Sequence, residues 1–144
     1  MFMDGRELRM NILIVDDSRF LRLANERALT KAGHNVICAS DGEEGLRLAI
    51  ERQPDLIVLD MLLPKISGPD VLRAIRGNPE IGKTPVMVLT SLPQANEDKL
   101  LKEGAAAYFE KSLLTIDKES APFVEAVERL LARTARAKAA ATGK

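Results

Sequence analysis

Polar residues that could do chemistry directly follow short apolar runs of this 144-residue chain. Asp16 and Asp17 follow the first run, Asp60 ends the third, Thr90 ends the fourth, and Lys111 comes just after the fifth. If these runs are parallel strands, their carboxyl ends share one edge of a sheet, which is where ligands bind. We therefore expect three carboxylates, a hydroxyl and an ammonium group to converge.

Three converging carboxylates repel one another, and each disfavours ionisation of its neighbours. A divalent cation relieves this repulsion. Mg²⁺ suits hard oxygen ligands that are shared with phosphate, and Mn²⁺ is an alternative. Lys111 offers a positive charge to a phosphoryl oxygen, and Thr90 offers a hydrogen bond. Taken singly, such residues are more often loop or capping residues, but together at four strand ends they favour an aspartate that receives a phosphoryl group.

The apolar runs alternate with amphipathic stretches, which predicts five strands, each followed by a helix. Residues 55–60 form the clearest run, because consecutive apolar positions are typical of a strand buried on both faces of a parallel sheet. The alternation predicts a doubly wound α/β domain in three layers but leaves the strand order open. The predicted strands are 11–15, 35–39, 55–60, 85–90 and 107–110, and helical patterns span 18–33, 40–54, 69–77, 93–104 and a stretch that begins near residue 120.

Local signals mark where several of these helices begin. Ser18 is a predicted N-cap, Ser40 and Glu43 have the spacing of a capping box, and Pro69 suits a first helical turn. The second helix is expected to turn one apolar face inward. That face consists of Leu46, Ala49 and Ile50.

The composition argues against several classes of protein. Lys and Arg number 21, as do Asp and Glu, and the chain has 3% aromatic residues and no Trp, so it lacks the basic face and stacking rings of many nucleic-acid-binding proteins. No apolar stretch could span a bilayer, and the first residues lack the apolar core of a secretory signal. We expect a cytoplasmic single-domain protein without direct nucleic-acid or membrane contacts.

Two single residues invite a functional role that the sequence does not support. Cys38 is the one cysteine, which excludes an internal disulfide, and it is predicted to be a small core residue. His34 is the one histidine, and it is predicted to be a solvated residue in the turn before the second strand.

Residues 10–131 carry the strand and helix pattern, and both ends extend it. Residues 1–9 precede a second candidate start at Met10 and are predicted to be an N-terminal extension. Residues 132–144 are basic and rich in alanine, which predicts a C-terminal tail or the remnant of a linker. Because alanine favours helices, the last helix could instead run on into this segment.

Four segments resemble the motifs of one family. They are residues 15–18, 59–68, 89–91 and 108–111. The second segment is the most specific, because Pro64 and Gly68 follow Asp60 at the family's spacing. On these motifs, residues 10–131 resemble the receiver domain of two-component response regulators.

This resemblance implies that Asp60 is the phosphoacceptor, which takes a phosphoryl group from a phosphohistidine of a sensor histidine kinase or of a histidine phosphotransfer protein. It implies a Mg²⁺ site formed by Asp17, Asp60 and the backbone carbonyl of Leu62, with Asp16 contributing through water. It also implies a flavodoxin-like strand order, 2-1-3-4-5. Such a domain takes part in its own phosphorylation and dephosphorylation but is a signalling domain rather than an enzyme.

Further implied roles concern the phosphoryl group and the switch. The resemblance implies that Thr90 and Lys111 contact the phosphoryl group, together with the backbone of Met61 and Ser91. It makes Tyr108 the switch residue, whose rotamer follows a shift of Thr90, whereas a plainer interpretation is a half-buried ring on an edge strand. The implied output surface, built from the fourth helix, fifth strand and fifth helix, binds a downstream protein target and could form a homodimer.

The sequence departs from the family pattern in three ways. Ser112 stands where many members have a proline, which leaves the conformation of the peptide before it open. The stretch 112–120 is slightly long for the family, which leaves the start of the last helix open. Leu62 and Leu92 lie two residues after the predicted phosphoacceptor and two residues after the predicted hydroxyl donor. These family positions influence access of water to the phosphoryl group, so two leucines predict slow self-dephosphorylation.

Three other interpretations compete with a working receiver. A pseudo-receiver or scaffold module would keep the fold without accepting phosphate, but all five expected site residues are present. A haloacid-dehalogenase-like phosphatase also uses an aspartate nucleophile and Mg²⁺, but it needs an acid/base Asp where this chain has Leu62. A dinucleotide-binding domain is disfavoured because the first turn, residues 16–19, carries two carboxylates and no glycine.

Overall fold

A five-stranded parallel sheet, with the order β2-β1-β3-β4-β5, forms the centre of the protein. The computed structural model describes residues 9–90, 97–110 and 121–142. The sheet confirms the predicted α/β class and the strand order that the family resemblance implied. The strands are β1 (Asn11–Val15), β2 (Asn35–Ala39), β3 (Leu56–Asp60), β4 (Val86–Thr90) and β5 (Ala107–Glu110).

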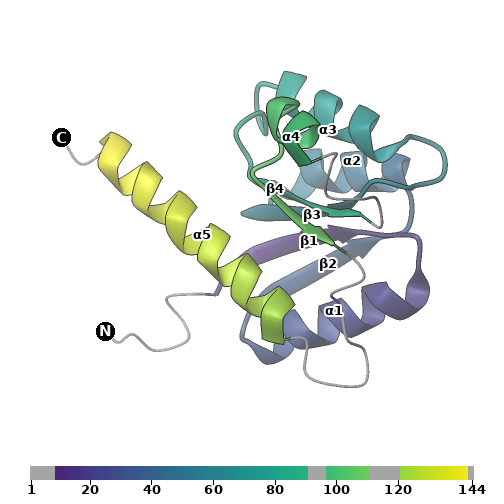
Figure 1. Cartoon of the computed structure of the whole chain (residues 1–144), viewed down its shortest axis with the longest axis horizontal. Helices are drawn as coiled ribbons and strands as arrows, with labels where there is room; N and C mark the ends of the chain where they lie inside the picture. Colours follow the sequence, from purple (N-terminus) through teal and green to yellow (C-terminus); the bar gives the residue numbers. More distant parts are fainter. Residues whose placement is uncertain (1–8, 91–96, 111–120, 143–144) are drawn as a thin grey trace.

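Helices cover both faces of this sheet and complete the three predicted layers (Figure 1). On one face lie α1 (Arg19–Lys31) and α5 (Ala121–Thr142). On the other face lie α2 (Gly42–Arg52), α3 (Gly68–Gly77) and α4 (Glu97–Lys102). The described part of the fourth helix is shorter than the predicted stretch, of which residues 93–96 lie outside the described residues.

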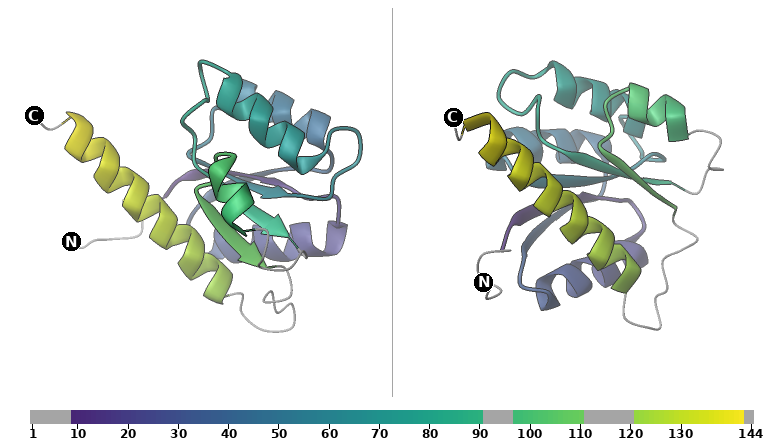
Figure 2. Two further views of the ribbon diagram at one scale, coloured as in Figure 1. Left: turned by 45° about the horizontal axis from the view of Figure 1, so that its top comes forward. Right: turned by 60° about the vertical axis from the view of Figure 1, so that its left-hand side comes forward.

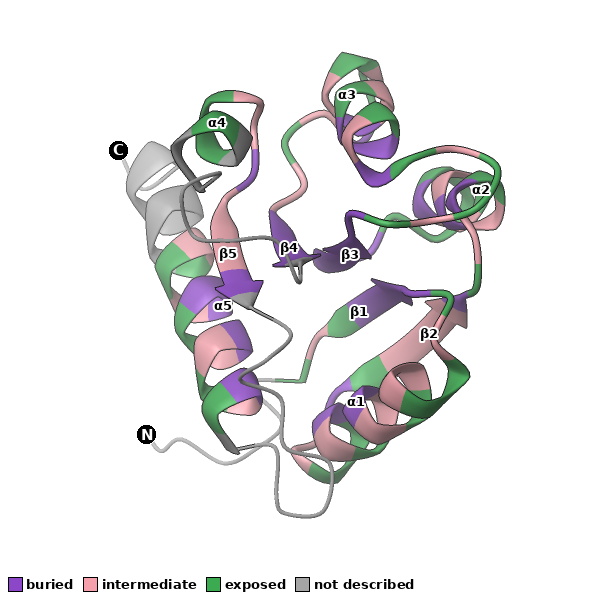
Figure 3. Cartoon of the chain, turned by 45° about the vertical axis from the view of Figure 1, so that its right-hand side comes forward, coloured by how far each residue is buried: buried purple, intermediate pink, exposed green. Residues whose placement is uncertain are grey.

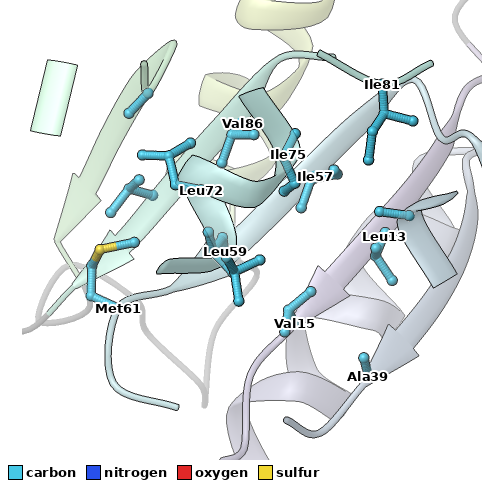
Figure 4. Packing of buried hydrophobic residues seen from close by; sticks show 14 residues of the cluster. Leu13, Val15, Ala39, Ile57, Leu59, Met61, Leu72, Ile75, Ile81 and Val86 are labelled. Carbon is cyan, nitrogen blue, oxygen red and sulfur yellow. The ribbon is translucent and has the colours of Figure 1, made fainter. Parts of the chain in front are cut away.

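The strands bury their side chains alternately in two apolar clusters, one under each helical layer. Leu13, Val15, Ile57 and Leu59 belong to the cluster under α2 and α3 (Figure 4). Ile12, Ile14, Leu56 and Val58 belong to the cluster under α1 and α5. All five residues of β3 are buried, as the continuous apolar run predicts (Figure 3). Burial of one large apolar side chain stabilises the fold by roughly 1.5–3 kcal/mol, so the two clusters together hold β1 and β3 side by side.

The helix starts follow two of the three predicted signals. The Ser18 hydroxyl accepts a hydrogen bond from the backbone N–H of Leu21, and Pro69 lies in the first turn of α3. The predicted cap of the second helix is wrong by one residue, because the carboxylate of Asp41, not the hydroxyl of Ser40, accepts from the N–H of Glu44 at 2.8 Å. The carboxylate of Glu44, and not that of Glu43, reaches back to the Ser40 N–H at 3.0 Å.

Ile50 was expected on the inner face of α2, and this prediction is wrong. Its side chain is exposed, whereas Ala49 is fully buried and Leu46 packs against the core. The buried residues of α2 are Gly42, Gly45 and Ala49, and Gly45 packs directly on Val15 of β1, so the side of α2 that meets β1 runs through Gly45 and Ala49 rather than Ile50.

His34 was predicted to be solvated, and the structure corrects this: the residue is 3% exposed. The backbone N–H of Met10 donates to Nδ1 at 3.2 Å, and Nε2 lies 3.0 Å from a carboxylate oxygen of Glu128 in α5. With Nδ1 accepting, Nε2 carries the proton toward Glu128. His34 therefore joins the start of β1, the turn before β2, and α5.

The last helix extends beyond the residues that pack on the sheet. Among the side chains that the structure describes, the last buried one in this helix is Leu131, while α5 continues to Thr142 and projects past the rest of the domain (Figure 2). Residues 132–142 are thus helical. Among the described residues, no helix combines the length and apolarity that a membrane span needs.

Cys38 packs, partly buried, against the cluster under α1 and α5. Burial raises the pKa of its thiol to about 12, so the thiol stays protonated near neutral pH. This agrees with the predicted role as a small packing residue.

Gly45 brings α2 so close to β1 that a methyl group does not fit, since an added Cβ would lie 2.7 Å from Cγ1 of Val15. We predict that Gly45→Ala lowers the free energy of unfolding by about 1–3 kcal/mol, because overpacking outweighs the better helix propensity of alanine. Urea denaturation followed by circular dichroism measures this difference.

Gly77→Ala is the matched control for this substitution. Gly77 is also helical, but an added Cβ there meets nothing within 4 Å. This variant should be neutral or more stable by up to about 1 kcal/mol. If both substitutions change the unfolding free energy equally, the close packing of α2 on β1 does not limit stability.

Candidate functional site

Three carboxylates meet at the carboxyl ends of β1 and β3. One ligand oxygen of each of Asp16, Asp17 and Asp60 lies within 4.8 Å of the other two. The strand register brings them together. Val15 pairs with Leu59, so the residues that follow these two, Asp16 and Asp60, lie side by side. Asp16 and Asp60 are buried, and Asp17 is exposed. The predicted cluster of carboxylates is therefore present.

Asp16 is held through its backbone as well as its side chain. Its N–H donates to the Ala39 carbonyl at 3.1 Å, and its carboxylate accepts from the Ser18 N–H at 2.9 Å. Its carbonyl oxygen accepts from the guanidinium of Arg22 at 2.7 Å. These bonds come from β2, from the turn after β1 and from α1, so three segments fix one acidic residue.

Asp60 ends β3, and the loop that follows folds back over it. The Leu62 N–H donates to the Asp60 carboxylate at 3.2 Å, and the Met61 N–H donates to the Leu89 carbonyl of β4 at 3.1 Å. Met61 is buried, whereas the side chain of Leu62 is 62% exposed. An apolar and largely solvated side chain thus stands two residues after the predicted phosphoacceptor.

Gly68 explains in physical terms why the motif after Asp60 ends in glycine. An added Cβ at Gly68 would lie 2.5 Å from the carbonyl oxygen of Asp60 and 2.5 Å from Cα of Met61. The Gly68 N–H also donates to the Met61 carbonyl at 3.2 Å. The first turn of α3 therefore presses on the backbone of the acidic site with no room for a side chain.

The loop between β3 and α3 is also attached to the start of α2. The Gly42 N–H donates to the Pro64 carbonyl at 3.3 Å, and the ammonium nitrogen of Lys65 lies 3.6 Å from carboxylate oxygens of both Asp41 and Glu43. A hydrogen bond from the Glu44 backbone, with a smaller contribution from Lys65, lowers the pKa of Asp41. Lys65 has a φ of 71°, a left-handed conformation that is unusual for lysine, so the loop holds it against its preference.

The other predicted site residues are placed less completely. Asp60 pairs with Leu89, so the backbone of Thr90 follows directly beside the acidic site at the end of β4. Tyr108 lies in β5, paired with Val88, and packs partly buried against the cluster under α2 and α3. Lys111, Ser91, Leu92 and Ser112 lie outside the described residues, as does the side chain of Thr90.

The donor set fits a hard divalent cation. Carboxylate oxygens are the protein ligands that Mg²⁺ and Mn²⁺ prefer, and three of them within reach of one point carry the negative charge that a cation offsets. The exposed Asp17 leaves the site open to solvent, from which water and a phosphoryl group could complete the coordination.

Neither Arg22 nor Lys65 stands out in the sequence as a site residue. The one available signal for Arg22 is its spacing, because it follows the N-cap Ser18 by four residues and so lies one helical turn further along the same side of α1. Lys65 gives no signal, because nothing in the residue type predicts a left-handed conformation.

The similarities to known proteins agree with this geometry. A family model for the response regulator receiver domain matches residues 12–118. Response regulator MprA of Mycobacterium tuberculosis is 35% identical over 127 residues, which cover 88% of this chain and 49% of MprA. Transcriptional regulatory protein AfsQ1 of Streptomyces coelicolor is 43% identical over 81 residues, which cover 56% of this chain and 35% of AfsQ1.

Solved structures show the same likeness. The receiver domain of the Francisella response regulator 1452 superposes with a TM-score of 0.77 at 28% identity, and the match covers 88% of this chain and 99% of that domain. The chain thus matches whole receiver domains but spans about half or less of the length of its curated relatives. With the sheet order, the carboxylate cluster and the family match in agreement, this chain belongs to the response regulator receiver domain family of two-component signal transduction.

Proposed function

We propose that this domain accepts a phosphoryl group on Asp60 from a phosphohistidine of a sensor histidine kinase or of a histidine phosphotransfer protein. The observation that carries the proposal is the position of Asp60: it is buried at the end of β3, with carboxylate oxygens of Asp16 and Asp17 within 4.8 Å. A buried carboxylate among others is unfavourable unless the site gains a compensating charge. A divalent cation would supply that compensation and would also offset the charge of an incoming phosphoryl group.

The transfer itself needs one bond to form and one to break. A carboxylate oxygen of Asp60 attacks the phosphorus, while the bond between phosphorus and the donor imidazole nitrogen breaks. The imidazole leaves with the bonding electron pair, and Asp60 becomes an acyl phosphate. The hydrogen bond from the Leu62 N–H orients the Asp60 carboxylate for this attack.

In this proposal a bound Mg²⁺ or Mn²⁺ offsets the charge of the carboxylates and of the incoming phosphoryl oxygens. Asp17 and Asp60 would hold it, with the backbone carbonyl of Leu62, and Asp16 would contribute through water. Lys111 and Thr90 would contact the phosphoryl oxygens, together with the backbone of Met61 and Ser91.

The output follows from the same arrangement. Thr90 ends the strand that pairs with β5, and Tyr108 of β5 packs against the cluster under α2 and α3. A shift of Thr90 toward the phosphoryl group would change the packing of Tyr108, and with it the surface of α4, β5 and α5. We propose that this surface binds a downstream protein or a second copy of the domain.

If Asp60 is the acceptor, phosphorylation must depend on its carboxylate. Incubation with acetyl phosphate and Mg²⁺ should add the mass of one phosphoryl group to the parent protein and none to Asp60→Asn, because an amide is not the nucleophile that a carboxylate is. Intact-mass spectrometry measures this gain in mass, and EDTA should abolish it.

The control is Asp70→Asn, which alters an exposed aspartate of α3 and should be phosphorylated like the parent. Phosphorylation of Asp60→Asn would place the acceptor elsewhere, and no gain in the parent would favour a pseudo-receiver.

If the three carboxylates form a cation site, the stability of the protein should depend on their charge and on Mg²⁺. Asp17→Asn removes one of the three mutually repelling charges, so the metal-free variant should unfold at a higher temperature than the metal-free parent, by a few degrees. The same variant should lose most of the stabilisation that Mg²⁺ gives the parent. Thermal unfolding with and without 10 mM MgCl₂, a concentration on the order of that needed for a weak site, tests both. A lower unfolding temperature for the metal-free variant would contradict a repulsive cluster.

The residue at position 62 should affect the lifetime of the acyl phosphate. Leu62→Asn replaces an exposed apolar side chain beside Asp60 with one that can hydrogen-bond water, so the phosphorylated variant should lose its phosphoryl group several-fold faster than the parent. The decay of the phosphorylated mass with time, after removal of the phosphodonor, gives the lifetime. Leu101→Asn, at an exposed leucine of α4, is the control and should leave the lifetime unchanged. Equal lifetimes for parent and Leu62→Asn would show that this position does not limit access of water.

A further inference from the structure

Arg22 differs from the other arginines of α1. Arg19 and Arg27 are exposed, whereas Arg22 is half-buried and reaches back along the helix toward the acidic site. Its Nη1 donates to the carbonyl oxygen of Asp16 at 2.7 Å, a short distance for a hydrogen bond from a charged donor. The backbone of Arg22 is fixed as well, since its N–H donates to the Ser18 carbonyl at 2.9 Å.

The bonded carbonyl belongs to the peptide that joins the two acidic residues. A peptide unit is planar, so a bond that fixes the orientation of the Asp16 carbonyl also fixes where Cα of Asp17 lies. The Asp16 N–H and carboxylate are held separately, by Ala39 and by the Ser18 N–H. Asp17 is the exposed member of the cluster, and its direction depends on the peptide that Arg22 holds.

Two effects of Arg22 on a cation at this site oppose each other. Its positive charge repels a cation and so lowers cation affinity. Its hydrogen bond keeps Asp17 directed toward Asp16 and Asp60 and so raises that affinity, and groups that hold a metal ligand in place typically change affinity by about 10–100-fold. Because the guanidinium bonds a backbone carbonyl and its charge is partly screened by solvent, we expect the second effect to dominate.

We propose that Arg22 is a positioning residue of the cation site, which sets the direction of the Asp17 carboxylate through the peptide between Asp16 and Asp17. This inference deepens the proposed function and rests on it, because it assumes that the three carboxylates bind a divalent cation. Arg22 itself contacts neither the cation nor the phosphoryl group.

Titration of the full chain with Mn²⁺, with free Mn²⁺ measured by electron paramagnetic resonance, tests the inference. Arg22→Met keeps the aliphatic stem and removes the donor, and it should weaken Mn²⁺ binding about tenfold. Arg22→Lys keeps a donor and the charge, and it should stay within about threefold of the parent. Arg27→Met removes the same charge from an exposed position of α1 and should bind like the parent.

A second measurement separates positioning from a general loss of structure. At saturating Mn²⁺, the rate of phosphorylation by acetyl phosphate should return to about that of the parent in Arg22→Met, since the ligands are then drawn into place. In the metal-free protein, the backbone amide resonance of Asp17 should shift, because its peptide loses the bond to Arg22, while resonances of β3 residues such as Ile57 should not. If Arg22→Met does not fold, Arg22→Leu, which is shorter and also lacks a donor, takes its place with the same expectations.

The outcomes distinguish the possible roles of Arg22. Equal or tighter Mn²⁺ binding by Arg22→Met would overturn the inference, because it would leave Arg22 as a structural residue or as a repelling charge. A rate that stays low at saturating Mn²⁺ would also overturn it. If the parent protein itself does not bind Mn²⁺, the proposed function fails, and the inference fails with it. If the parent binds Mn²⁺ and substitution of Arg22 does not change the affinity, the inference fails and the proposed function stands.

Discussion

The mutual repulsion of three carboxylates is the constraint on which the rest of the structure depends. The register of β1 and β3 sets Asp16 beside Asp60, and Asp17 follows immediately, so the central strand pair gathers three acidic residues at one edge, where a carboxylate oxygen of each lies within 4.8 Å of the others. Two of the three are buried, which costs free energy. The apolar clusters on both faces of β1 and β3 offset that cost, because neither strand can move away from the other without exposing them.

The segments around the carboxylates act mainly through the backbone. The Ser18 N–H and the Arg22 guanidinium hold Asp16, the Leu62 N–H holds Asp60, and Gly68 lets α3 approach the Asp60 backbone without a side chain between them. Backbone contacts of this kind fix direction without adding a carboxylate or an apolar wall to the site. The carboxylates therefore stay directed toward one point while Asp17 remains open to solvent, which a site that binds a cation and a phosphoryl group requires.

The sequence predicted the sheet well because its signals there are local and strong. Residues 56–59 are apolar in an unbroken run up to Asp60, and a strand buried on both faces needs that pattern. The family motifs then supplied the strand order, which the pattern alone could not. The errors concern the partners of single side chains. Ser40 and Asp41 are equally good caps by type, and His34 looks like a turn residue until Glu128, far away in the chain, comes beside it. Arg22 was missed for a different reason: its partner is a backbone carbonyl, which every residue carries and no residue type reveals.

The strand order explains where the acidic edge opens and which strands connect Asp60 to Tyr108. The chain leaves β1 for β2 by way of α1 on one face of the sheet, and it leaves β3 for β4 by way of α3 on the other face (Figure 1). The two loops diverge, so the acidic edge opens at the point where the order reverses. On the β1 side, the backbone of Asp16 is bonded to β2 and to α1. On the β3 side, the Met61 N–H is bonded to β4, and β4 pairs in turn with β5, where Tyr108 lies. If Asp60 accepts a phosphoryl group as proposed, the bond from Met61 to β4 and the pairing of β4 with β5 form the continuous connection from the acidic site to Tyr108.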